Sequence, residues 1–189
     1  MASKTSRLVR RTFEEGDATL LTSWLSTDPL ELFLTSSSLT FPPTEEEFLV
    51  YWRKNKAPDS HEFFSFVERT TGRHVGHCEM KGMSLRHGHG TIATVFIGRE
   101  ARGLGYGIEM LSMMLDFGFR DKGLHRVGLA VHTDNIPALA TYVRAGFRFE
   151  GTIRDVLRYD NRFHSLAQMS VLDSEYARLV AVHSEDLVL

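Results

Sequence analysis

The sequence has little of several features that would place a protein in a class at once. It contains one cysteine in 189 residues, so neither an intramolecular disulfide nor a multi-cysteine zinc site can form. No run approaches the roughly 20 apolar residues that a membrane-spanning helix needs. Lys and Arg number 22 against 24 Asp and Glu, for a net charge of −2. We therefore expect neither a membrane protein nor a nucleic-acid binder that relies on overall basic charge.

The features that are present are typical of a globular domain. Hydrophobic residues make up 42% of the chain and charged residues 24%, which excludes a disordered or collagen-like protein. The length fits one domain, and we expect a single unit over residues 1–189 with its core at about 8–175. The basic start Met1–Arg11 is not followed by the apolar segment of a secretory signal. We therefore expect a soluble, cytoplasmic protein.

Apolar patterns and turn signals predict strands and helices that follow one another along the chain. Thr44 with Glu47 three residues later fits a capping box, which predicts a helix to about residue 55. The acidic residues 45–47 would then serve the positive end of that helix, or would attract a cationic substrate. Strands are expected at 8–13, 62–69, 74–83, 91–98 and 124–132, and as a pair within 147–172. The other helices are expected at 17–26, 107–121, 136–145 and 174–181.

The clearest chemical signal is the stretch from Thr94 to Gly107, where a strand leads through a glycine-rich loop into a long helix. Gly103, Gly105 and Gly107 lack side chains, so backbone amides there can approach a ligand closely. The first amides of the helix carry partial positive charge, which favours an anion. Arg102 adds a full positive charge and a bidentate fork. The loop therefore predicts a site for a phosphate or pyrophosphate.

The spacing of this loop excludes two common phosphate motifs. No Lys-Ser or Lys-Thr follows, as a Walker loop requires, and Ile108 occupies the last glycine position of a dinucleotide fingerprint. The pattern that fits is R-x-x-G-x-G. Twenty-eight residues after Gly107 a second motif begins, N-x-x-A-x-x-x-Y-x-x-x-G-F. Its specified positions are all matched, by Asn135, Ala138, Tyr142, Gly146 and Phe147.

Together the two motifs resemble those of the GNAT superfamily of acetyl-coenzyme A-dependent N-acetyltransferases. The resemblance covers about residues 8–175 and is tightest over 95–151. The segments 75–79 and 146–151, followed by Arg154, resemble one subgroup of that superfamily. This subgroup includes ribosomal-protein N-terminal acetyltransferases and spermidine acetyltransferases.

The resemblance implies an α/β fold with a mixed, mostly antiparallel twisted sheet flanked by helices. Two splayed parallel strands, here 91–98 and 124–132, would form the cleft for acetyl-CoA. Backbone groups near Phe96 and Ile97 would pair with its pantetheine arm, and Asn135 would contact it from the next helix. Its pyrophosphate would be held by Arg102, Gly103, Leu104, Gly105, Tyr106 and Gly107.

The implied reaction moves acetyl directly to a primary amine. A lysine-like amine has a pKa of about 10.4, so a base or a desolvating pocket is needed at neutral pH. The resemblance makes Tyr142 the proton donor to the departing thiolate, unless its ring only packs and orients the sulfur. Glu79 would act as a base through water, unless it is a solvated strand residue. His132 is a second candidate and Asp155 a weaker one. Cys78 is expected to be a core thiol.

Several alternatives stay open. The acceptor would be either a protein N-terminal α-amine or a small amine such as a polyamine. The rival function is a non-catalytic CoA-binding sensor or interaction module, which could dispense with Tyr142. No metal site is expected, since His74 and His77 are three apart on a predicted strand and should point to opposite faces. Exposed strand edges could pair a homodimer, and no nucleic-acid or membrane partner is expected.

Overall fold

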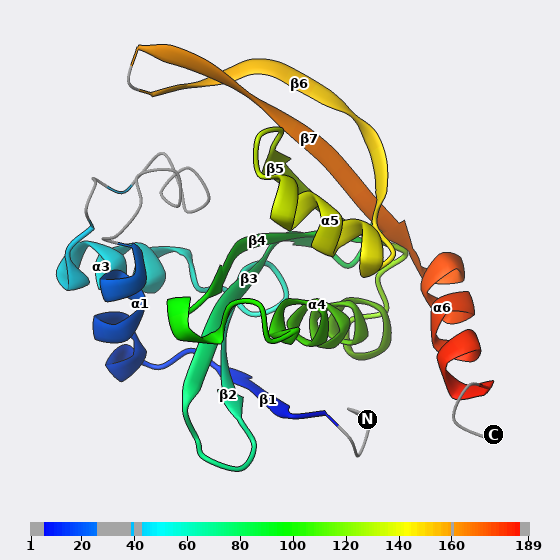
Figure 1. The fold of residues 1–189 in the computed structure, drawn as a ribbon, viewed down its shortest axis with the longest axis horizontal. Coiled ribbons are helices and arrows are strands. Elements are labelled where there is room, and N and C mark those ends of the chain that lie inside the picture. Colours follow the sequence, from blue (N-terminus) through cyan, green and yellow to red (C-terminus); the bar gives the residue numbers. More distant parts are fainter. Residues whose placement is uncertain (1–5, 26–38, 40–42, 160, 186–189) are drawn as a thin grey trace.

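The computed structural model describes residues 6–25, 39, 43–159 and 161–185, and it is built on a seven-stranded sheet (Figure 1). The strand order is β1-β2-β3-β4-β5-β7-β6. Neighbouring strands are antiparallel except for the parallel pair β4 and β5. The strands are β1 (Leu8–Thr12), β2 (Glu62–Glu68), β3 (His74–Ser84), β4 (His89–Ile97), β5 (Arg126–His132), β6 (Arg148–Tyr159) and β7 (Arg162–Leu172). The expected mixed, mostly antiparallel sheet is therefore confirmed.

Helices cover both faces of this sheet. They are α1 (Ala18–Leu25), α3 (Glu45–Asn55), α4 (Tyr106–Asp116), α5 (Ile136–Arg144) and α6 (Asp173–Glu185). The helix expected over 107–121 is thus shorter, because residues 117–121 form a π-helical turn. The final helix runs beyond its expected end. No helix in the described part of the chain is long and apolar enough to cross a membrane.

Side chains alternate along the strands between two cores. Phe63 packs in a cluster with α1 and α3, whereas Phe64 packs in a cluster with α4. On β3, Cys78 and Met80 face the α4 side. Helices α1 and α3 therefore lie on the face opposite α4, and the one residue between Cys78 and Met80 points toward α1 and α3. This places Glu79 on the α1 and α3 face.

The parallel strands β4 and β5 pair over only part of their length. Residues 89–91 of β4 pair with residues 126–128 of β5, and the ladder between them ends there. From that point β4 runs on to Ile97 and β5 to His132 with their main chains apart. The splayed pair expected from the family resemblance is therefore present, and it opens toward the loop before α4.

A bulge in β4 lies beside this opening. His77 pairs with Phe96 and Glu79 pairs with Ala93, so β4 holds one more residue than β3 over the same span. Within the bulge Thr94 has a φ of 50°, a left-handed conformation that β-branched residues rarely adopt. Such strained positions persist only where the surrounding structure holds them, and they are common beside active sites.

A second bulge corrects one expectation. Phe66 pairs with Gly76, but the next residue, Val67, pairs with His74, so β3 holds one extra residue. The extra residue shifts the alternation of side chains by one position. His74 and His77 therefore share a face and line one small cavity beside α1, and the prediction that they point to opposite faces is wrong.

The start of α3 follows the capping box that the sequence indicates. Glu47 N donates to Thr44 Oγ1 at 3.2 Å, and Thr44 N donates to Glu47 Oε2 at 2.9 Å. Glu45 Oε2 accepts a hydrogen bond from Thr19 Oγ1 on α1 at 2.8 Å. The acidic run therefore stabilises the helix start and ties α3 to α1.

A buried aspartate joins β1, β2 and the start of α1. Asp17 is 7% exposed, and Arg11 donates to its two carboxylate oxygens at 2.6 and 2.8 Å. Ser65 Oγ donates to it at 2.6 Å and Glu14 N at 3.0 Å. Burial raises the pKa of Asp17, but these hydrogen bonds outweigh burial and lower it below the ordinary value. Asp17 therefore stabilises the fold above about pH 4, and that contribution is lost as the pH falls through its lowered pKa.

We expect Asp17→Asn to lower the free energy of unfolding by about 3 kcal/mol, because the variant removes the buried anion that pairs with the partly buried Arg11 guanidinium. Urea denaturation at pH 7 measures the change. The matched control is Glu15→Gln two residues earlier, whose ion pair with Arg53 is exposed. That control should cost less than about 1 kcal/mol. Equal losses in the two variants would contradict the role given to Asp17.

Candidate active site

The glycine-rich loop lies at the N-terminus of α4, after β4 and a 3₁₀ turn over Arg99–Ala101. Gly103 has a φ of 75°, and Gly105, the N-cap of α4, has a φ of 82°. Both values fall in the left-handed region that favours glycine. The first amides of α4 have no partners within the helix. The local geometry therefore matches an anion cradle built from main-chain N–H groups.

Gly107 packs closely against β4 and α5. A Cβ there would lie 3.0 Å from Ile97 Cδ1 and 3.4 Å from Thr141 Cγ2 on α5. Arg102 is folded against the same strand end, since its Nε donates to the Ile97 carbonyl at 3.0 Å. The loop, the end of β4 and α5 are thus drawn together where β4 and β5 separate.

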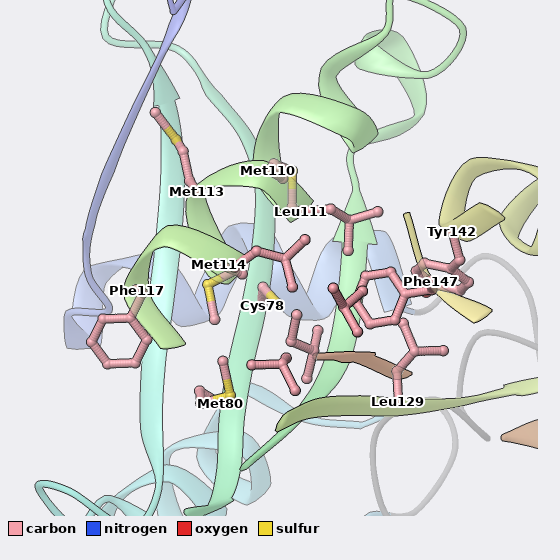
Figure 2. Packing of buried hydrophobic residues seen from close by; sticks show 14 of the residues in the cluster. Cys78, Met80, Met110, Leu111, Met113, Met114, Phe117, Leu129, Tyr142 and Phe147 are labelled. Atoms are coloured by element: carbon pink, nitrogen blue, oxygen red, sulfur yellow. The ribbon is translucent and has the colours of Figure 1, made fainter. Parts of the chain in front are cut away.

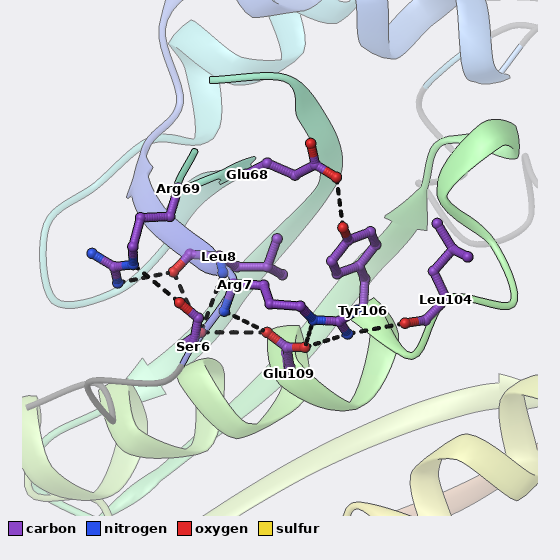
Figure 3. Close-up of polar contacts among 8 residues, drawn as sticks. All are labelled: Ser6, Arg7, Leu8, Glu68, Arg69, Leu104, Tyr106 and Glu109. Carbon is purple, nitrogen blue, oxygen red and sulfur yellow. Dashed lines mark hydrogen bonds and ion pairs between the residues drawn. The ribbon is translucent and has the colours of Figure 1, made fainter. Parts of the chain in front are cut away.

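The remaining loop and strand residues contribute in different ways. The Phe96 ring is buried in the core beneath α1 and α3, and the residue pairs with His77 of β3 on the side of β4 away from the gap. Leu104 is half exposed. The Tyr106 hydroxyl donates to Glu68 Oε1 on β2 at 2.5 Å, which turns that side chain away from the loop (Figure 3). For Leu104 and Tyr106, a contact with a ligand in the loop therefore depends on backbone groups.

Asn135 caps α5, because its Oδ1 accepts a hydrogen bond from Ala138 N at 3.2 Å. The structure thus gives this side chain a role in the fold, beside the cofactor contact assigned to it from the sequence. Two helical turns later α5 carries Tyr142. The motif that begins at Asn135 therefore determines where α5 starts and where the phenol of Tyr142 lies.

Tyr142 is 7% exposed and packs beside Phe147, with ring centroids 5.9 Å apart (Figure 2). Burial, and next the proximity of Cys78, raises the pKa of the Tyr142 phenol well above its ordinary value. The phenol is therefore protonated at neutral pH and able to donate. Burial also raises the pKa of the Cys78 thiol, and this confirms Cys78 as a buried thiol rather than a reactive one.

Glu79 is fully buried, which corrects the alternative of a solvated strand residue. The Tyr51 hydroxyl donates to its Oε2 at 3.0 Å, and His61 Nε2 lies 2.7 Å from the same oxygen. Burial raises the pKa of Glu79, but the hydrogen bond with His61 and the adjacent His77 ring outweigh burial and lower it to about 2. The carboxylate is therefore ionised at neutral pH.

The second oxygen of Glu79 belongs to a cluster of unpaired buried atoms. Among the described residues, no hydrogen-bond partner is found for Glu79 Oε1, Thr94 Oγ1 or either ring nitrogen of His77. His77 Nε2 is 3.8 Å from Glu79 Oε1. These atoms lie together beside the β4 bulge, where the His77 ring and the Thr94 hydroxyl both help to lower the pKa of Glu79.

The two weaker candidates lie in different surroundings. His132 ends β5 and is buried, with its ring 5.6 Å from that of His164. Burial, and next the His164 ring, lowers the pKa of His132, so the ring is neutral at neutral pH. Asp155 is exposed on the β6–β7 hairpin, where its amide donates to Ser165 Oγ at 3.0 Å. The structure therefore brings His132, but not Asp155, to the end of the splayed pair.

Sequence reasoning missed the groups that hold Glu79. Tyr51 lies on the buried side of α3 with Phe48 and Trp52, a spacing that could have marked it as a polar group facing the core. His61 precedes β2 and carries no sequence signal. No group of three or more His, Cys, Asp or Glu side chains suited to a metal ion is found in the described segments.

Comparison with known proteins matches this chain to acetyltransferases. A family model described as an acetyltransferase (GNAT) domain matches residues 7–148. An uncharacterized N-acetyltransferase, p20 of Bacillus licheniformis, is 24% identical over 173 residues, which cover 92% of this chain and 97% of that protein. The spermidine N(1)-acetyltransferase of Vibrio cholerae is 28% identical over 82 residues, or 43% of this chain and 47% of that protein.

A solved structure shares the fold. The spermidine N-acetyltransferase from Vibrio cholerae in complex with CoA and spermine superposes with a TM-score of 0.80 at 20% sequence identity. The match covers 92% of this chain and 99% of that one. The arrangement of sheet, loop and helices described above is therefore that of a known enzyme fold.

Proposed function

The chain belongs to the GNAT acetyltransferase family, whose model spans residues 7–148, and on that premise we propose that its acceptor is the primary amine of a small cation such as a polyamine. It is an N-acetyltransferase with acetyl-CoA as donor. The observation that carries the proposal is the gap between β4 and β5, with the glycine-rich loop at its end and a buried ionised carboxylate beside the β4 bulge.

Acetyl-CoA supplies the acetyl group as an activated thioester. The main-chain N–H groups of Gly103, Gly105 and Gly107, together with Arg102, would hold its pyrophosphate at the positive end of α4. Backbone groups of β4 near Phe96 would line the pantetheine arm. The left-handed φ of Gly105 and the close packing of Gly107 against β4 and α5 support this assignment.

Tyr142 would act on the leaving group of the reaction and Glu79 on the acceptor amine. Tyr142 belongs to the core on the α4 side of the sheet, and Glu79 faces the α1 side. The protonated phenol would give its proton to the departing thiolate. The ionised carboxylate would bind the ammonium of the acceptor and stabilise the positive charge on its nitrogen. A group with a pKa of about 2 is a poor general base at neutral pH, so neutral His132 suits proton removal better.

Glu79→Gln should raise the KM for a cationic acceptor by about 10- to 100-fold, the loss expected for one charge-assisted hydrogen bond. Glutamine keeps the size of the side chain and can still accept from Tyr51. Steady-state thiol release measures the change. The control is Glu150→Gln, because Glu150 lies on the edge strand β6, where it is bonded to Arg126 of β5 and Ser170 of β7. An acceptor KM that is the same in Glu79→Gln and wild type would contradict this role.

The experiment that tests the function is a calorimetric titration with acetyl-CoA, followed by thiol release against a panel of amines. The panel contains spermidine, spermine, amino acids and a peptide with a free α-amine. Binding with fastest turnover on the polyamines supports the proposal. Turnover on the peptide alone would make the acceptor a protein N-terminus. Tight binding without turnover would favour the non-catalytic CoA-binding module, and no binding would contradict the loop assignment.

A homodimer stays a prediction. Strand β6 forms one edge of the sheet and β1 the other, and both could pair with a second copy. Light scattering on the purified protein measures the mass in solution against the 21.5 kDa of one chain.

A further inference from the structure

The side chain of Arg7, the residue just before β1, contacts the glycine-rich loop on its outer side (Figure 3). Arg7 Nη2 donates to the Leu104 carbonyl at 2.9 Å, and Arg7 Nε donates to Glu109 Oε1 at 2.6 Å. The same guanidinium lies 4.4 Å from the ring centre of Tyr106. Arg7 therefore contacts the loop, the first residue of α4 and the first turn of that helix at once.

Arg7 is itself held in place. Its backbone N–H donates to Glu109 Oε2 at 3.1 Å, and its carbonyl accepts from Arg69 N at 2.8 Å. The ring beneath it is anchored as well, because the Tyr106 hydroxyl is bonded to Glu68. Although its side chain is half exposed, Arg7 is part of a connected frame from β1, β2 and α4 rather than an isolated surface ion pair.

The bond to Leu104 sets the direction of the next amide. In a trans peptide the C=O and the following N–H point in opposite directions. Because Arg7 holds the Leu104 carbonyl, the Gly105 N–H points away from Arg7, toward the inner face of the loop. A Cβ on Gly105 would lie 3.4 Å from Arg7 Nη2, so the guanidinium also closes the outer side of this residue.

We propose that Arg7 is a positioning residue for the pyrophosphate of acetyl-CoA, acting by fixing the Leu104–Gly105 peptide before the donor binds. This inference rests on the proposed use of acetyl-CoA. Glu109 neutralises the charge of Arg7, so the effect comes from orientation rather than from attraction at a distance. A loop that is already ordered loses less conformational entropy on binding, which appears as tighter binding.

The test compares two acetyl donors in Arg7→Gln and wild type. Acetyl-CoA carries the pyrophosphate, whereas acetyl-pantetheine ends before it. We expect the KM for acetyl-CoA to rise roughly 10-fold at unchanged kcat, the loss expected when a loop residue must be ordered on binding. The kcat/KM for acetyl-pantetheine should be unchanged. That second donor also reports whether the variant is folded.

The matched control is Arg10→Gln, three residues later on β1. Arg10 donates to the Met113 carbonyl at 3.0 Å and to Asp121 at 2.9 Å, toward the other end of α4. It should leave the KM of both donors unchanged. An equal loss with both donors in Arg7→Gln, or an unchanged KM for acetyl-CoA, would overturn the inference. A wild-type protein that uses neither donor would instead overturn the proposed function.

Discussion

Tyr142→Phe is expected to lower kcat about 100- to 1,000-fold, the range typical of removing a general acid. The substitution removes only the hydroxyl, so the ring still packs against Phe147 and the dissociation constant of acetyl-CoA should change little. Burial keeps the phenol protonated well above neutral pH. The rate should therefore show no fall between pH 7 and pH 9 caused by this group. Thiol release and calorimetry measure the two quantities.

A second buried tyrosine provides the control for this experiment. Tyr176 has the same exposure as Tyr142, and its hydroxyl donates to the Ser112 carbonyl at 3.4 Å. Tyr176→Phe should leave kcat unchanged. If Tyr142→Phe turns over as fast as wild type, Tyr142 is not the acid and its ring only packs in the core.

Gly105→Val is expected to weaken acetyl-CoA binding at least 100-fold. The φ of 82° strains any β-branched residue, and a Cβ there meets Arg7 Nη2 at 3.4 Å. Strain of this kind costs about 1–3 kcal/mol, and it is relieved only if the loop moves. The moved amides no longer converge on a pyrophosphate. Calorimetric titration of the variant measures the loss.

Gly72→Val, in the turn between β2 and β3, is the control for the effect of backbone strain alone. Gly72 has a φ of 70°, and no atom lies within 4 Å of a Cβ built on it. This variant should lose stability to a similar degree, as measured by thermal unfolding, and bind acetyl-CoA as wild type does. Equal affinities for the two glycine variants would show that the loop at Gly105 does not hold the pyrophosphate.

The parts of the site that could be predicted from the sequence are those encoded by neighbouring residues. The alternate glycines, the capping box at Thr44 and the cap at Asn135 are local patterns, and each appears in the structure at its expected place. The order of helices and strands along the chain also follows from such local patterns. Local chemistry fixes such features before any tertiary contact forms.

The surroundings of Glu79 could not be predicted, because residues far apart in the sequence make them. Tyr51 comes from α3 and His61 from the segment before β2, and they meet Glu79 only when α3 packs on the sheet. A glutamate in a strand is typical of an exposed position. Packing overrides that pattern here and leaves the carboxylate buried and ionised.

The two bulges also lacked a sequence signal. An extra residue in β4 reverses which face each later side chain occupies, and nothing in the local sequence marks the residue that is extra. Gly76 is a partial exception, since a Cβ there would lie 2.5 Å from both Met110 Sδ and the Phe96 carbonyl. A glycine inside a strand can indicate such a close approach.

Hydrogen exchange measures most directly whether acetyl-CoA binds in the gap between β4 and β5. Amide exchange is measured by mass spectrometry with and without saturating acetyl-CoA. We expect slower exchange in residues 92–97 of β4, in the loop 102–107 and in residues 129–132 of β5. Bound acetyl-CoA that leaves all three segments unchanged, while protecting another part of the chain, would contradict the account.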